Sequence, residues 1–381
     1  MTTMGRSKIF IEPVLDAVNS DPSLDKEKLK KELNDRDSRK AILAIFTRLF
    51  PEIPLGNKEV SRLVIEKTHL ESTIQNYWSI PLGMLLLEIE LARAALAYFG
   101  EHVSLKIPAD KRNLESALFF LQRRACVVAS EILCLLESGY ADGAESRWRT
   151  LNEMAITSEF LFQNGDKFAE RYAKYRAVVE LKKNRNLKEQ AEKYLLNPGP
   201  NQSQSTKESL KSAIESYSKA IKHLEEEVTQ LCEQFGPSFK NSNGWAAAAF
   251  PNNHKDRRVH LDEIANKVTS STTIPYCRLS MRAFANDNVH QGSVGDIHSR
   301  GDFGPRNTVL LGASPVGMYM PISNTAEDLA ITTYMLLSIY PTWQCGVINL
   351  MIKIISDSIS AIACEREKGV IEYAKSLKEL S

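Results

Sequence analysis

A short polar segment of the chain carries the residue types that metal-independent cleavage of RNA requires. It reads RAFANDNVH at residues 282–290. On a helix, Arg282, Asn286 and His290 follow one another at i, i+4 and i+8 and form one polar stripe. A histidine can act as general acid or base near neutral pH, and a fixed arginine can stabilise charge that develops on a phosphate. These three residues are therefore the candidate catalytic residues.

The same stripe also fits a purely structural role. Eight residues of straight helix place the alpha carbons of Arg282 and His290 about 12 Å apart, which strains a shared phosphate contact. A break near Asn288, or a second subunit, would relieve that strain. Otherwise the stripe is a capped helix end whose histidine satisfies a backbone carbonyl. Both interpretations stay open from the sequence.

Further polar residues are candidates for binding. Arg149 and Glu153 lie one turn apart on an expected helix, where an intrahelical ion pair is the ordinary interpretation. If their side of the helix faced the long loops instead of water, it would bring a guanidinium near His290. The remaining candidates are basic or imidazole side chains on a charged helix and in a loop: Lys182, Lys183, Arg185, His254, Arg257 and Arg258. The three residues of the helix could contact an RNA backbone, or form an ordinary solvated face, and the three residues of the loop could bind a protein or small-molecule partner.

Four of the seven histidines lie in or beside two long irregular stretches, together with several aspartates. Imidazole and carboxylate groups suit zinc, manganese or iron, but the spacings H-x-x-x-H and H-E-x-x-H do not occur. The chain also lacks a P-loop and a serine hydrolase signature. We therefore expect no metal site and no cofactor.

The elements that must position these residues read as helices. Apolar residues recur every three or four positions over residues 110–135 and again between Gly143 and Gly165, so these two helices should form a hairpin. Residues 166–196 continue as a helix, and Ser205 with Glu208 forms a capping box for the next one. The period-two alternation of strands is almost absent. The predicted class is all-α, a multi-helix bundle with long antiparallel helical hairpins and two long irregular loops.

The ends of the chain complete this organisation. The first hundred residues look helical, with breaks at Pro51, Pro54 and Pro81. Near the other end, Asn324 should cap a helix to residue 340, and a last helix should follow from residue 343. We expect an N-terminal helical region over residues 1–100 and a helical bundle domain over 101–381, with loops at 237–262 and 291–321.

Composition limits the classes of function. The 381 residues are 43% hydrophobic and 25% charged, and 48 Lys and Arg against 47 Asp and Glu give a net charge of +1. No global positive field therefore attracts nucleic acid or an anionic membrane. The apolar stretch 81–99 is interrupted by Glu88, Glu90 and Arg93, and the six cysteines form no C-x-x-C pair. A soluble, cytoplasmic protein without membrane association is expected.

Three sequence patterns resemble an uncharacterised family of bacterial all-helical proteins. They are LLESGYADGA at residues 135–144, RWRTLNE at 147–153 and RYAKY at 171–175. The pairs Leu-Ser at 279–280 and Val-His at 289–290 resemble the serine and V-H pair that closes the family's domain. The resemblance covers roughly residues 110–300.

Such proteins are similar to the HEPN group (higher eukaryotes and prokaryotes nucleotide-binding), which includes dimeric ribonucleases of toxin and antiphage systems. The HEPN motif is an arginine, four to six residues and a histidine, whereas seven residues separate Arg282 from His290. The resemblance implies a ribonuclease or abortive-infection effector that acts on RNA as a homodimer. The alternative is a non-catalytic helical protein that binds a protein or small-molecule partner through its loops.

Overall fold

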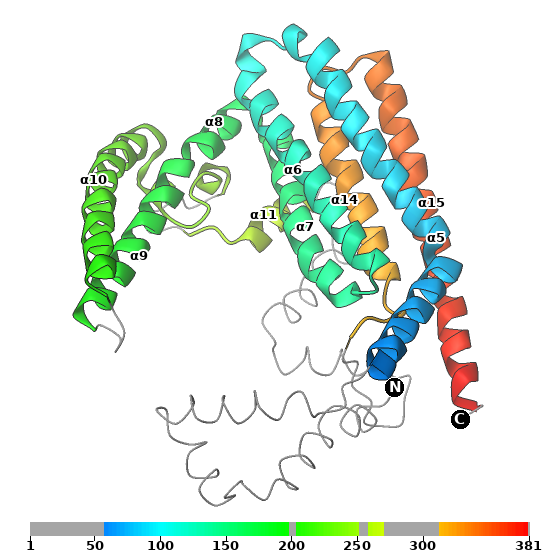
Figure 1. Ribbon diagram of the computed structural model, residues 1–381. Coiled ribbons are helices and arrows are strands. Elements are labelled where there is room, and N and C mark those ends of the chain that lie inside the picture. The colour runs from blue at the N-terminus through cyan, green and yellow to red at the C-terminus, as the bar shows by residue number, and fades with distance from the viewer. Residues whose placement is uncertain (1–56, 198–202, 251–257, 270–311, 380–381) are drawn as a thin grey trace, which may run out of the picture.

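The computed structural model describes residues 57–197, 203–250, 258–269 and 312–379, and these ranges contain helices and no strand (Figure 1). The predicted all-α class is confirmed. The α-helices are α5 (Asn57–His102), α6 (Arg112–Glu137), α7 (Ala141–Asn164), α8 (Asp166–Lys174), α9 (Arg176–Leu196), α10 (Gln204–Phe235), α11 (Leu261–Thr269), α14 (Tyr319–Leu337) and α15 (Trp343–Glu379). Short 3₁₀ turns are η2 (Ser104–Lys106), η3 (Ala109–Lys111), η4 (Pro237–Lys240) and η5 (Ala247–Ala249).

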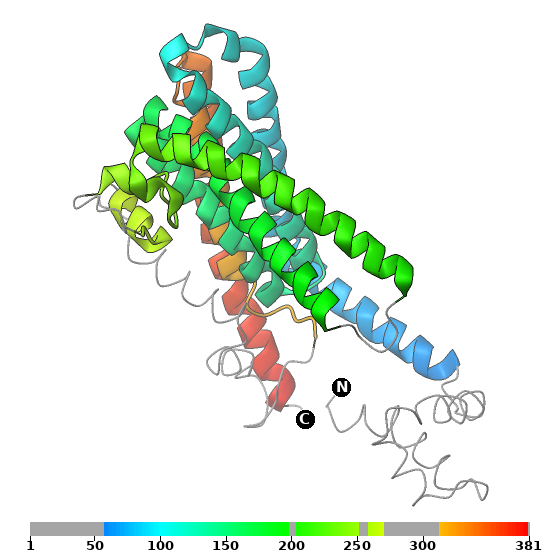
Figure 2. The same cartoon turned by 90° about the vertical axis from the view of Figure 1, so that its left-hand side faces the viewer.

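The body of the molecule is a bundle of α5, α6, α7, α14 and α15 (Figure 1). The predicted stripe of α6 faces its interior, where Leu118, Ala125 and Val128 are buried. α6 and α7 form the expected antiparallel hairpin, and α9 with α10 forms a second one. Figure 2 shows α9 and α10 side by side in front of the bundle. Both predicted features, the bundle and the long hairpins, are therefore present.

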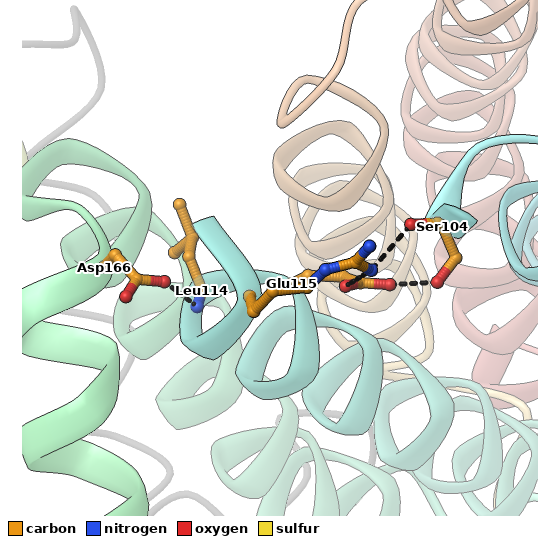
Figure 3. A network of polar contacts seen from close by, with 5 residues as sticks. Ser104, Leu114, Glu115 and Asp166 are labelled. Carbon is orange, nitrogen blue, oxygen red and sulfur yellow. Dashed lines mark hydrogen bonds and ion pairs between the residues drawn. The ribbon is translucent and has the colours of Figure 1, made fainter. Parts of the chain in front are cut away.

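The helix expected over residues 166–196 is divided at Tyr175 into α8 and α9. The first residue of α8 holds the beginning of α6 (Figure 3): Asp166 Oδ1 accepts a hydrogen bond from Leu114 N at 2.9 Å, and its Oδ2 accepts one from Asn113 Nδ2 at 2.8 Å. These backbone and side-chain donors at the start of α6 are thereby satisfied. The division lets α9 leave the bundle and pair with α10.

Two predicted helix starts are wrong. The N-cap of α10 is Ser203, whose Oγ accepts from Thr206 N at 3.1 Å, so Ser205 lies inside the first turn. α14 begins at Tyr319, and Asn324 is a buried residue of its interior. Pro321 belongs to the first turn of α14, where its missing N–H would have no helical partner. The irregular stretch expected over 291–321 therefore ends before Tyr319, and only its last part, from residue 312, is described.

Pro81 does not break the first described helix, because α5 runs through it from residue 57 to 102. Pro81 is buried with Trp78, Leu82 and Leu85 around it, and this packing holds the helix although one backbone hydrogen bond is lost. α5 crosses residue 100 without interruption and packs against α6, α14 and α15. The expected domain boundary at residue 100 stays a prediction, and Pro51 and Pro54 lie outside the described residues.

Candidate functional site

The catalytic candidates Arg282, Asn286 and His290 lie outside the described residues, and so do the binding candidates His254 and Arg257. The structure describes the residues that precede the range 270–311 and those that follow it. The binding candidates on α7 and α9, together with Arg258, are within the described part of the chain.

Both ends of the range 270–311 lie beside α7. Before it, α11 ends at Thr269 and packs against α7. After it, Ser314 N donates to the carbonyl oxygen of Gly139 at 2.9 Å, immediately before α7 begins. Gly139 has a φ of 78°, and a Cβ there would lie 3.2 Å from Ser314 N, so glycine suits both its backbone and this close approach. The range that carries the catalytic candidates therefore starts and ends against one helix.

One side of the same helix, α7, carries a polar cluster. Residues eleven apart on a helix differ by only about 20° in direction, so Glu145 lies on the same side as Ile156, and Arg149 on the same side as Phe160. Ile156 and Phe160 are buried in the half of α7 nearer its C-terminus. In the other half this side holds Glu145, Arg149 and Glu153, all partly exposed. This side of α7 is therefore apolar and buried toward the C-terminus of the helix, and polar and partly exposed toward its N-terminus.

The polar cluster combines a cation with two carboxyl groups. Arg149 Nε lies 3.5 Å from Glu153 Oε1, so the predicted intrahelical ion pair is confirmed. Burial, and then the nearby Asp142 carboxylate, raise the pKa of Glu145 to about 7. A carboxyl group with that pKa can give or take a proton near neutral pH. Sequence analysis missed Glu145, although its spacing of four residues from Arg149 was visible.

The side of α7 that faces α14 has a structural role. Trp148 Nε1 donates to Asp328 Oδ2 at 2.7 Å, and Asn152 Nδ2 donates to the same oxygen at 3.1 Å. All three side chains are buried. On a further side, Arg147 pairs with Glu131 of α6. Within the pattern RWRTLNE, Trp148 and Asn152 therefore pack against α14, whereas Arg149 and Glu153 belong to the polar cluster.

The three basic candidates on α9 have different surroundings and do not form one cluster. Arg185 Nη2 lies 2.6 Å from Glu225 Oε1, so Arg185 links α9 to α10. Lys183 is exposed. Lys182 is near Arg258, and partial burial followed by this neighbouring charge lowers the pKa of Lys182. The charges of Lys182 and Arg258, which are distant in sequence, thus influence each other in the fold.

The pattern RYAKY holds the turn that follows α10. Arg171 is buried and donates to three backbone carbonyl oxygens, those of Phe235 at 3.0 Å, Gly244 at 3.1 Å and Trp245 at 2.8 Å. Tyr175 Oη donates to the carbonyl oxygen of Asn241 at 2.6 Å. These contacts bind each of the three guanidinium nitrogens to the backbone, and the side chain is buried, so this part of the pattern is structural.

A groove of about 570 Å³ lies between the end of α5, η2 and the first turns of α6. At one end Ser104 Oγ donates to Glu115, while Arg112 Nη1 donates to Ser104 O at 2.8 Å and lies 3.0 Å from Glu115 Oε2 (Figure 3). At the other end the guanidinium of Arg123 lies 5.5 Å from the centre of the Phe120 ring. Within the described ranges, no group of three or more His, Cys, Asp or Glu side chains could hold a metal ion.

Comparison with known families supports the resemblance to uncharacterised proteins. Residues 115–299 match the model of a family of unknown function, DUF5677. The matched range begins in α6 and includes the polar cluster of α7 and the catalytic candidates, but neither α14 nor α15. Searches of curated proteins and of solved structures give no significant match. This chain is thus similar, over slightly less than half its length, to a family whose function is unknown.

Proposed function

We propose that the chain is a HEPN-like helical ribonuclease of the antiphage or abortive-infection type that acts without a metal ion. The observation that carries the proposal is the position of the described residues that precede and follow the range 270–311, which contains Arg282, Asn286 and His290. On both sides of this range the described chain lies beside α7, the helix that carries the polar cluster. The family match joins the same two parts of the chain.

The roles follow from the chemistry of RNA cleavage. A base removes the proton of the ribose 2′-hydroxyl, whose oxygen then bonds to phosphorus, while the bond from phosphorus to the 5′-oxygen breaks and an acid protonates that oxygen. His290 supplies one of these proton transfers. Arg282 and Arg149 stabilise the negative charge on the phosphate oxygens, and Glu145, with its pKa near 7, is the partner for the second proton transfer.

The test is cleavage of labelled single-stranded RNA by the purified full-length chain, with and without a chelator. His290→Ala should reduce cleavage by roughly 10²-fold or more, and Arg282→Ala should do likewise. His223→Ala, which removes an exposed histidine of α10, is the matched control and should cleave as the wild type does. Melting temperatures of all variants separate lost chemistry from lost folding.

Three results would overturn the assignment: no RNA cleavage by the wild type, full activity of His290→Ala, or complete loss of activity in the chelator. The last result would indicate a metal-dependent enzyme. A variant of Glu145 sharpens the test, because Glu145→Gln keeps the side-chain size but cannot exchange a proton. It should remove the limb of the pH–rate profile that the ionisation of Glu145 produces near pH 7.

A second candidate function is that of a non-catalytic interaction protein. It is favoured by a row of exposed apolar side chains on α15, outside the region that matches the family. It is also favoured by the pairing of Arg185 with Glu225, which reduces the positive charge available to an RNA backbone. This candidate would be selected if the chain binds RNA without cleaving it, or if it neither binds nor cleaves RNA.

A further inference from the structure

The outward side of α15 is unusually apolar for a protein surface. Trp343, Val347, Leu350, Met351 and Ile354 are exposed to 75%, 46%, 60%, 46% and 56%. Their spacing of three and four residues puts them in one row along the helix. Large contiguous apolar patches on soluble proteins generally mark an interaction site. We refer to these five residues as the α15 stripe.

The α15 stripe is short, neutral and sharply bounded. From Trp343 to Ile354 it runs about 16 Å along the helix. The ionised side chains within and next to it, Lys353 and Asp357, pair with each other. Beyond Asp357 the exposed positions become polar, with Glu365 and Lys368. A partner for this surface must therefore be apolar, and it needs no particular net charge.

A lipid surface fits these facts less well than a protein does. The stretch from Trp343 to Tyr373 is long and apolar enough to cross a membrane by composition. However, Glu367 of α15 accepts hydrogen bonds from the backbone N–H of Gly317 at 2.7 Å and of Tyr319 at 3.2 Å, which ties the helix to the bundle. Surface helices that bind anionic lipid also carry an excess of Lys and Arg beside the apolar row, whereas the α15 stripe has only Lys353, which pairs with Asp357.

The first described residue of the chain lies far from the α15 stripe. α5 and α15 are antiparallel, because the ring of Tyr77 lies 5.6 Å from that of Tyr373 and Glu88 is close to Asp357. Asn57, where α5 begins, is therefore at the end of the bundle away from Leu350. Roughly 40 residues of helix, or about 60 Å, separate the two levels.

We propose that the α15 stripe is the contact with a second copy of this chain. The two stripes pack antiparallel about a two-fold axis between Leu350 and Met351, so that Val347 faces the partner's Ile354. A neutral apolar row is complementary to itself, as such an isologous contact requires. In the views of Figures 1 and 2, α15 lies at an outer side of the bundle, away from α9 and α10, so a second copy can approach it.

The proposed dimer is weak, and it does not depend on the ribonuclease proposal. Five side chains offer less than the ~800 Å² per partner of a standard stable interface, so we expect a Kd in the micromolar range. Sedimentation velocity of the full-length chain at about 1 to 100 μM should show a reversible shift from monomer to dimer, because this range brackets such a Kd.

The decisive variant is Leu350→Glu, which places a charge at the two-fold axis and should keep the chain monomeric throughout that range. Leu105→Glu is the matched control, since Leu105 is 85% exposed on η2 and does not belong to the α15 stripe. It should associate as the wild type does. In a background with the exposed Cys134 changed to serine, Leu350→Cys should form an intermolecular disulfide when oxidised glutathione is added, and Leu105→Cys should not.

A wild type that stays monomeric at the highest concentration overturns the proposal, and so does a Leu350→Glu variant that still dimerises. Flotation with neutral and anionic phospholipid vesicles tests the competing occupant. If the wild type is monomeric in solution and binds vesicles, and Leu350→Glu abolishes that binding, the stripe is a lipid contact instead. Circular dichroism and melting temperature verify that each variant is folded.

Discussion

Two regions of this molecule each bury an ionisable side chain, and they do so in opposite ways. In the turn after α10, Arg171 donates to three carbonyl oxygens and lies 5.0 Å from the ring centre of Phe235. In the seam between α5 and α15, Glu88 is fully buried and neither of its oxygens has a hydrogen-bond partner among the described residues. The first group has a hydrogen-bond partner at each of its three nitrogens, and the second has none at either oxygen.

The difference determines which form of each group the fold stabilises. Burial lowers the pKa of Arg171, but an arginine stays charged at any pH a protein experiences, so the carbonyl oxygens must compensate the charge. Burial, and then the charge of Asp357, raise the pKa of Glu88 well above its ordinary value. The carboxyl group avoids the cost of buried charge by keeping its proton. Arg171 thus organises a turn, whereas Glu88 makes its seam sensitive to pH.

Arg171→Met should give the largest effect. It leaves three backbone carbonyl oxygens without their donor, so we expect a loss of about 3–5 kcal/mol in the free energy of unfolding. Arg171→Lys keeps the charge but not the planar set of donors and should lose less. Urea unfolding measures both. Arg123→Met, at an exposed arginine of α6, is the control. Equal losses of stability at the two positions would mean that the burial and the carbonyl partners of Arg171 do not determine its contribution.

Gly244→Ala tests the same turn through its backbone. A Cβ at this position would lie 2.1 Å from Phe239 O and 2.5 Å from Ser238 O, and these backbone atoms can move only with the turn. We expect destabilisation by about 2–4 kcal/mol. The control is Gly83→Ala on the exposed side of α5, where a Cβ meets nothing within 4 Å. That variant should be stabilised by about 0.5–1 kcal/mol, and a tolerated Gly244→Ala would show that the turn adapts.

Glu88→Gln tests the other region through pH. Above the unfolded-state pKa of 4.5 the unfolded chain loses this proton while the folded chain keeps it, so the wild type loses stability as pH rises toward the raised pKa. Glutamine carries no such proton. The variant should therefore match the wild type near pH 4.5 and become more stable by about 1–3 kcal/mol as pH rises.

Thermal unfolding between pH 4.5 and 8.5 measures this divergence. Glu372→Gln, at an exposed position of α15, should follow the wild type over the whole range. Constant separation of the Glu88→Gln and wild-type curves would mean that Glu88 ionises normally in the folded chain.

The sequence predicted elements whose signals are local. The spacing of Leu118, Ala125 and Val128 indicated α6, and Gly165 and Gly236 marked the ends of α7 and α10 correctly. The break predicted at Pro81 and the loop predicted to reach residue 321 are wrong, because a proline is tolerated in a first helical turn or where tertiary packing holds the helix around it. Neither condition can be read from neighbouring residues.

In the candidate site, too, only the contact that depends on local spacing could be predicted from the sequence. The Arg149–Glu153 pair follows from a spacing of four residues. The pKa of Glu145 depends on burial by distant parts of the chain, which no local spacing encodes. Glu88 shows the limit most directly: in the sequence its charge only interrupts an apolar stretch, and nothing near it indicates that the side chain is fully buried. Arg282, Asn286 and His290 stay predictions, because they lie outside the described residues.

The smallest expected effect concerns charges that remain in water. Arg185 and Glu225 join α9 to α10 through a 2.6 Å contact, but their side chains are 56% and 48% exposed. Solvent and salt screen such a pair, so Arg185→Gln should lower the free energy of unfolding by no more than about 0.5 kcal/mol, and 0.5 M salt should remove the difference. A loss comparable to that of Arg171→Met would mean that exposure does not separate the two kinds of cation. If RNA affinity instead falls while stability is unchanged, Arg185 is available to a phosphate backbone despite its pairing with Glu225, and the basic side of α9 belongs to the RNA-binding surface.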